Sequence, residues 1–273
     1  MKVLIFGANG YAGQAITHKL KEEHEVFGTY HTKIKQYVHS YSMHRYELGD
    51  TDTLKSILDC VHPQIIISSL TGDFKLQLAA HDQIADYLLE NKKGKIIYIS
   101  TANVFDARKE QPHSEQDEIG SETEYGNFKI KCERMLQEKL SDRCIIIRIP
   151  QIWGKDCPRI LKLIEDTKNN TPIATYPNFY VNYTTNIQIA EWMDYIIKEN
   201  LSGVFHIGTK DTYDYMQFQM DLSKTIGLDE PIFEKEIIPQ KCFQAVLPDR
   251  KEIPECFQMK VVDVIEYLGK VQI

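Results

Sequence analysis

The sequence predicts an α/β protein with a doubly wound parallel sheet, a Rossmann fold, followed by a smaller C-terminal lobe that binds substrate. Two observations lead to this fold class. Short apolar runs alternate with amphipathic stretches over residues 1–150, which is the alternation of strands and helices in a parallel sheet. The apolar runs are continuous in isoleucine and valine, as expected of strands with helices on both faces.

Each element follows from its periodicity. Strands are predicted where apolar residues run together, at Val3–Phe6, Val26–Tyr30, Ile65–Ser68, Ile96–Ile99 and Ile145–Ile149. Helices are predicted where apolar residues recur at helical spacing, at Ala12–Leu20, Thr53–Cys60, Leu76–Glu90 and Glu124–Leu140.

Prolines interrupt this rhythm beyond Pro150, where a strand at Val204–Ile207 and a helix near Tyr215–Ile226 are predicted. We therefore expect a dinucleotide-binding domain over residues 1–150, rejoined by about 186–208. Residues 151–185 and 209–273 are expected to form the lobe, over the carboxyl ends of the strands, where open α/β sheets bind ligands.

Bulk composition narrows the function classes. The 273 residues are 42% hydrophobic, enough for a sizeable core. The formal net charge of −7 argues against a nucleic-acid partner. The chain contains no apolar run of the roughly 18 to 20 residues of a membrane span and begins at once with a strand, so we expect a cytoplasmic protein without a membrane partner. The six cysteines are scattered without metal-ligand spacing, so we expect free thiols and no metal.

The first predicted strand runs directly into a glycine-rich turn, in which Gly7, Gly10 and Gly13 are spaced three apart. Gly7 permits the tight turn, Gly10 lets a pyrophosphate approach the backbone, and Gly13 lets the helix pack closely. The phosphates then lie at the helix N-terminus. This context predicts a nicotinamide dinucleotide site, to which we also assign Asn9 and Tyr11.

The end of the second strand favours NADP(H) over NAD(H). NAD-binding sites usually carry an acidic residue there, which binds the ribose 2′-hydroxyl. The segment Gly-Thr-Tyr-His-Thr-Lys over residues 28–33 has none. His31 and Lys33 have groups that can bind a 2′-phosphate, although they also suit a solvated basic loop.

A second constellation points to proton transfer. Tyr125 and Lys129 are four residues apart and share one helix face. The ammonium is expected to lower the pKa of the phenol, so that the tyrosine exchanges a proton with a carbonyl while hydride moves. Ser100 and Thr101 end the preceding strand, where a hydroxyl can orient the substrate oxygen. Either pair alone is common on ordinary helices and turns, but together they predict a reduction centre.

Five motifs in order resemble the extended short-chain dehydrogenase/reductase family, and within it the dTDP-4-dehydrorhamnose reductase group. They cover roughly residues 1–155. They are the glycine-rich turn, I-S-T-x-x-V-F-D at Ile99–Asp106, P-x-x-E-x-D at Pro112–Asp117, Y-G-x-x-K at Tyr125–Lys129 and R-I-P-x-x-x-G at Arg148–Gly154.

The resemblance implies roles for individual residues. Thr101 would orient the substrate, Tyr125 would be the general acid, and Lys129 would also contact the nicotinamide ribose. Further cofactor contacts are implied for Ser100, for the segment Ser68 to Leu70, and for either Glu47 with Leu48 or Asp50 at the adenine.

The implied function is NAD(P)H-dependent reduction of a keto group on a nucleotide-activated sugar. Two alternatives stay open. One is a non-catalytic NADP-binding regulatory subunit, because Ala102 and Asn103 stand where the family usually has Asp and Tyr. The other is an epimerase or dehydratase. A homodimer is suggested by family analogy alone.

Overall fold

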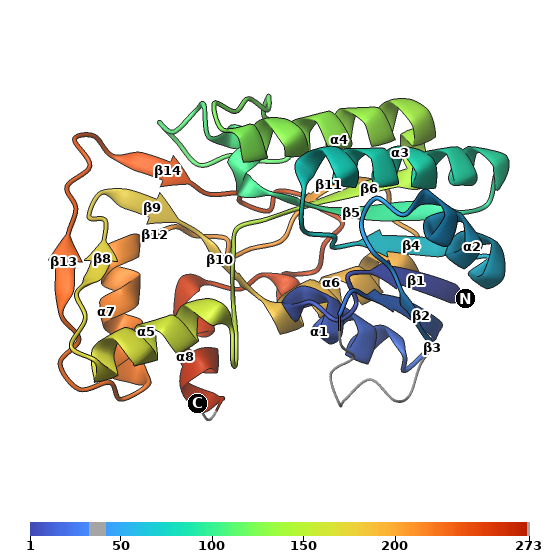
Figure 1. Ribbon diagram of the computed structural model, residues 1–273. Coiled ribbons are helices and arrows are strands. Elements are labelled where there is room, and N and C mark those ends of the chain that lie inside the picture. Colours follow the sequence, from blue (N-terminus) through green and yellow to red (C-terminus); the bar gives the residue numbers. More distant parts are fainter. Residues whose placement is uncertain (33–41, 272–273) are drawn as a thin grey trace.

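The computed structural model describes residues 1–32 and 42–271, and its centre is a seven-stranded parallel sheet (Figure 1). The strand order is β11-β6-β5-β4-β1-β2-β3. The order reverses beside β1, which pairs with β4 on one side and β2 on the other, so a ligand crevice is expected there. The strands are β1 Lys2–Phe6, β2 Glu25–Tyr30, β3 Ser42–Arg45, β4 Ile65–Ser68, β5 Lys95–Thr101, β6 Cys144–Ile149 and β11 Gly203–His206.

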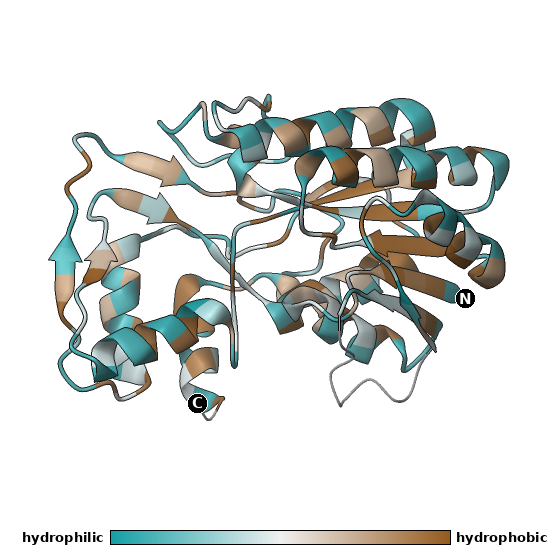
Figure 2. Ribbon diagram, in the orientation of Figure 1, coloured by the Kyte–Doolittle hydropathy of each residue, from teal (hydrophilic) through white to brown (hydrophobic). Residues whose placement is uncertain are grey.

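Helices cover both faces of the sheet, and Figure 2 shows the strands between them as strongly hydrophobic. Successive residues of β1 serve opposite layers, as a strand requires. Val3 and Ile5 pack with helices α1 (Tyr11–Leu20) and α6 (Asn186–Lys198), whereas Leu4 and Phe6 pack with α2, α3 and α4. These three span Thr51–Val61, Phe74–Glu90 and Glu124–Leu140. The predicted doubly wound α/β fold is confirmed.

Two helices begin two residues earlier than the sequence predicted, because an aspartate caps each of them. Asp50 accepts a hydrogen bond from the Thr53 amide at 2.9 Å, so α2 begins two residues before the predicted start. Asp73 accepts from two amides at the start of α3 in the same way. Helix α6 was not predicted at all. Its buried residues include Ile189, Met193 and Ile196, which recur at the helical spacing that marks such a segment.

The lobe has its own aromatic core. The ring of Phe218 stacks on Tyr183 at a centroid distance of 3.8 Å and meets Trp153 edge-on at 5.0 Å. The helices here are α5 Pro158–Lys168, α7 Tyr215–Thr225 and α8 Val261–Lys270. The short strands are β7 Gln151–Trp153, β8 Ile173–Thr175, β9 Phe179–Val181, β10 Tyr183–Thr185, β12 Tyr213–Asp214, β13 Phe233–Lys235 and β14 Cys242–Gln244; the 3₁₀ turns of the chain are η2 Ala102–Phe105, η3 Ser141–Arg143 and η4 Glu255–Phe257.

The chain returns from β14 to the large sheet through a segment anchored by Glu115. One carboxylate oxygen of Glu115 accepts from the His206 amide at 2.9 Å, and the other accepts from the Asp249 amide at 3.0 Å. Glu115 belongs to the P-x-x-E-x-D motif, so this motif fastens the returning segment to the loop that follows β5. Within residues 1–32 and 42–271, no helix has the length and apolar character needed to span a bilayer.

Candidate active site

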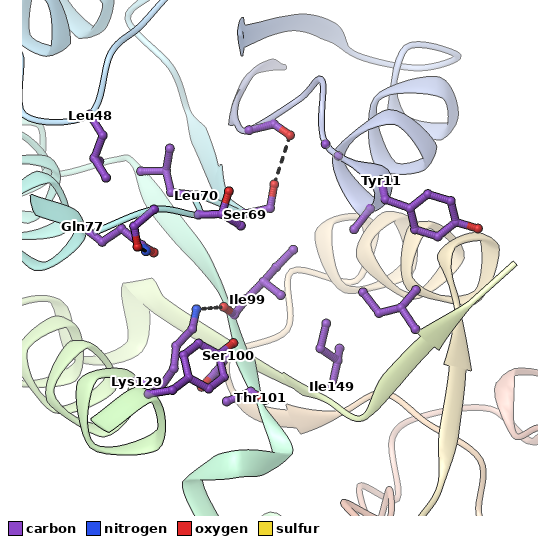
Figure 3. A pocket seen from close by; sticks show the side chains of 18 of the residues that line it. Tyr11, Leu48, Ser69, Leu70, Gln77, Ile99, Ser100, Thr101, Lys129 and Ile149 are labelled. Carbon is purple, nitrogen blue, oxygen red and sulfur yellow. Dashed lines mark hydrogen bonds between the residues drawn. The ribbon is translucent and has the colours of Figure 1, made fainter. Parts of the chain in front are cut away.

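A cleft of about 970 Å³ opens at the carboxyl ends of the strands and is drawn in Figure 3. Its lining comes from the glycine-rich turn, the ends of β2 to β5, the start of α4 and three lobe segments. Most sequence-predicted site residues meet here: Gly7, Asn9, Gly10, Tyr11, Gly13, His31, Glu47, Leu48, Ser100, Thr101, Tyr125 and Lys129 all line it. Lys33 lies outside the described residues.

The glycine-rich turn has the shape that a dinucleotide needs. Gly7 has a φ of +81°, and a Cβ there would lie 2.7 Å from the Ser69 carbonyl oxygen. A Cβ on Gly13 would lie 2.2 Å from the Gly7 oxygen, so this glycine sets the packing of α1. A Cβ on Gly10 would approach only the Gly7 oxygen, at 3.1 Å, and would otherwise occupy the cleft. Since Gly10 has no side chain to cap α1, the first amides of that helix are available to an anion.

The two alternatives for the adenine contact, Glu47 with Leu48 and Asp50, differ in where the structure places them. Glu47 and Leu48 line the cleft, while Asp50 is committed to capping α2. At the end of β2, Thr29 accepts a hydrogen bond from the Gly7 amide at 3.0 Å, and His31 stands exposed at the rim. The described residues of this rim, Thr29 to Thr32, contain no carboxylate.

Ser68 does not lie where the resemblance implied. It is 1% exposed, and its hydroxyl lies 2.7 Å from His81 Nε2, on the helix-covered face of β4. The His81 Nδ1 atom faces the Gln77 carbonyl at 2.6 Å and therefore carries the proton, so Ser68 donates to Nε2. Side chains alternate along a strand, and among the described lining residues it is the next one, Ser69, that contributes to the cleft.

Lys129 is buried beneath the cleft with its charge solvated by the protein. Its ammonium donates to the Ile99 carbonyl at 2.9 Å, as Figure 3 shows, and sits 4.7 Å from the Tyr98 ring centroid. The Tyr125 ring centroid is 6.0 Å away, so the tyrosine and the ammonium share one helix face as predicted. Burial lowers the pKa of Lys129 to about 8.

The pKa of Tyr125 moves in the direction opposite to the one expected. Burial raises it above 10, and hydrogen bonding with Thr101 only partly lowers it again. Desolvation therefore outweighs the hydrogen bond with Thr101 in setting the pKa of Tyr125. In this environment Tyr125 holds its proton and is suited to donate it.

The two hydroxyls at the end of β5 have different partners. Thr101 donates to the side-chain oxygen of Asn103 at 3.0 Å. Ser100 donates to Glu133 at 2.5 Å in the interior, although it was expected to contact the cofactor. Asn103 and Ala102 both line the cleft, so the positions that depart from the family pattern belong to its wall.

Several lining residues were missed from the sequence. Phe74 stacks on Phe128 at 4.8 Å and lies 5.8 Å from the Tyr125 ring, which makes an apolar wall beside the phenol. The lobe contributes Gln151, Arg159 and Gln244. No local pattern marks these residues, because only folding brings them to the cleft. In the described part of the chain, no three His, Cys, Asp or Glu residues are grouped so as to hold a metal ion.

Comparison with known proteins agrees with this fold. The family described as RmlD substrate binding domain matches residues 1–252. A dTDP-4-dehydrorhamnose reductase from Yersinia enterocolitica is 17% identical over 100% of this chain and 99% of its own, with a TM-score of 0.80. The Bacillus anthracis reductase of that name, solved with NADP, is 15% identical over 98% of each chain, with a TM-score of 0.79. WbmH of Bordetella bronchiseptica, solved with NAD+, is 13% identical over 100% of this chain and 99% of its own, with a TM-score of 0.81. No curated protein matched.

Proposed function

The chain belongs to the RmlD substrate binding domain family, and we propose that it is an NAD(P)-dependent reductase of the extended short-chain type that reduces a keto group of a nucleotide-activated sugar. The observation that carries this proposal is the position of three side chains. Thr101, Tyr125 and Lys129 line the same cleft as the glycine-rich turn, so a ketone and a nicotinamide can lie together beside the phenol.

The chain's own groups have distinct tasks in this reaction. Thr101 holds the ketone oxygen, and Tyr125 gives its proton to that oxygen as negative charge develops there. The ammonium of Lys129 lies 6.0 Å from the Tyr125 ring and stabilises the phenolate that remains. The bound dinucleotide supplies the hydride.

We further propose that the cofactor is NADP(H) rather than NAD(H). Support comes from the rim at the end of β2, where hydroxyls and His31 face the cleft instead of a carboxylate. Similar folds have been solved with either cofactor. The preference for NADP(H) over NAD(H) therefore depends on the rim residues and not on the fold.

The function is tested by following NADPH oxidation, and separately NADH oxidation, with a panel of 4-keto nucleotide sugars. Tyr125→Phe should lower turnover about 10²- to 10⁴-fold. It should leave the affinity for NADPH unchanged, because the ring and its contact with Phe74 remain. Equal turnover of Tyr125→Phe and the parent chain would exclude Tyr125 as the general acid. A chain that binds NADPH tightly but consumes none with any ketone would point instead to a regulatory subunit.

A further inference from the structure

A buried ion pair lies directly behind the proposed catalytic residues. Glu133 on α4 is 0% exposed, and Arg148 on β6 is 4% exposed. The guanidinium donates to both carboxylate oxygens, with the shortest contact 2.8 Å from Nη2 to Oε2. Ser100 on β5, the register partner of Arg148, donates to the same carboxylate at 2.5 Å.

Stability alone does not explain this pair. Moving two charged groups out of water usually costs more free energy than their mutual attraction restores. Apolar residues of similar size would often stabilise the fold more. Phe105 lies 5.2 Å from the guanidinium, and the buried imidazole of His206 has its Nε2 atom 3.5 Å from Arg148 Nη1. A charged cluster in such surroundings is better explained by what it holds in place.

The cluster holds the catalytic helix against the catalytic strand. Tyr125, Lys129 and Glu133 are spaced four apart on α4 and so project from one face. Each reaches the end of β5: Tyr125 bonds with Thr101, Lys129 with the Ile99 carbonyl and Glu133 with Ser100. Three successive strand residues are thereby tied to three successive helix turns.

We propose that Glu133 is a positioning residue: its carboxylate, oriented by Arg148, binds Ser100 and thereby fixes where Thr101 and Tyr125 meet the substrate. This inference rests on the proposed function. This role also explains why the Ser100 hydroxyl bonds to Glu133 inside the protein although Ser100 borders the cleft.

Glu133 also affects the charge state of Lys129. The other titratable groups facing that ammonium are neutral near pH 7, because burial raises the pKa of Tyr125, Tyr98 and Cys132 and lowers that of His81. Glu133 is then the nearby charge that favours the ammonium. Glu133→Gln removes this negative charge and leaves the positive charge of Arg148 without its partner. Both changes disfavour a protonated Lys129.

The test compares Glu133→Gln and Ser100→Ala with Glu138→Gln, which alters an exposed carboxylate on the same helix. Glu133→Gln should lower kcat about tenfold to a hundredfold, the range expected for a small displacement of a catalytic group. The KM for the ketone should change much less than kcat, since the substituted residue does not itself touch the substrate. The control should match the parent chain. Parental kcat in folded Glu133→Gln, or a loss that only follows the folded fraction, would overturn the proposal.

Two readouts need no turnover. In nuclear magnetic resonance with isotope-labelled lysine, assigned through Lys129→Arg, Lys129 should titrate at lower pH in Glu133→Gln and unchanged in Ser100→Ala. A crystal structure of Ser100→Ala, which leaves the ion pair intact, should show Thr101 displaced from Tyr125. If Glu133→Gln does not fold, an undisplaced Thr101 in Ser100→Ala refutes the idea by itself. Absence of turnover in the parent chain refutes the proposed function, while these two readouts still decide the role of Glu133.

Discussion

The pH dependence of turnover tests the electrostatics of this site most directly. Burial lowers the pKa of Lys129 from 10.5 to about 8, and the protonated form is the one that stabilises a phenolate on Tyr125. Because the pKa in the folded chain is lowered, nearly all of Lys129 is protonated only below about pH 7. The protonated fraction falls as the pH rises through about 8. With the ordinary pKa of 10.5, half of Lys129 would stay protonated up to about pH 10.5, about two and a half pH units further.

The magnitude follows from that value. About half of Lys129 is protonated at pH 8 and about one tenth at pH 9, so kcat/KM should fall roughly tenfold for each pH unit above 8. The phenol adds no alkaline limb of its own in this range, since burial raises the pKa of Tyr125 above 10.

The assay is initial-rate NADPH oxidation from about pH 6 to 10 at constant ionic strength. Lys131→Gln, which changes an exposed lysine on the same helix, is the matched control and should keep the parental profile. An alkaline limb near pH 10 in the parent chain would contradict this prediction, because it would mean that burial does not govern the charge of Lys129.

The remaining predictions concern the cofactor. Gly10→Val should abolish measurable NADPH binding in calorimetry while the chain stays folded by circular dichroism, since the new side chain would project into the cleft. The control Gly120→Ala, whose Cβ has room, should bind NADPH normally. Retained affinity for NADPH in Gly10→Val would contradict the assignment of the turn. His31→Ala should weaken NADPH binding about tenfold and leave NADH binding unchanged, because only the former carries a 2′-phosphate; equal losses for both cofactors would exclude His31 as the phosphate contact.

Parts of the site could be predicted from the sequence because the patterns that indicate them are local. A strand, a glycine-rich turn and a helix follow one another within residues 2–20, and each glycine has a steric reason inside that unit. The spacing of Tyr125 and Lys129 likewise fixes their shared face. Local signals do not fix which strand face a residue joins, and Ser68 was therefore placed in the cleft although its neighbour Ser69 lines it.

Periodicity and short spacings act through neighbours in the chain, so residue order was enough to predict the fold class, the glycine-rich turn and the helix that carries the phenol and the amine. The partners of Ser100, the lobe residues Arg159 and Gln244 at the cleft, and the pKa directions of Tyr125 and Lys129 became known only from the folded chain. Desolvation and long-range contacts depend on what folding packs around a group, and residues distant in the chain supply most of those surroundings.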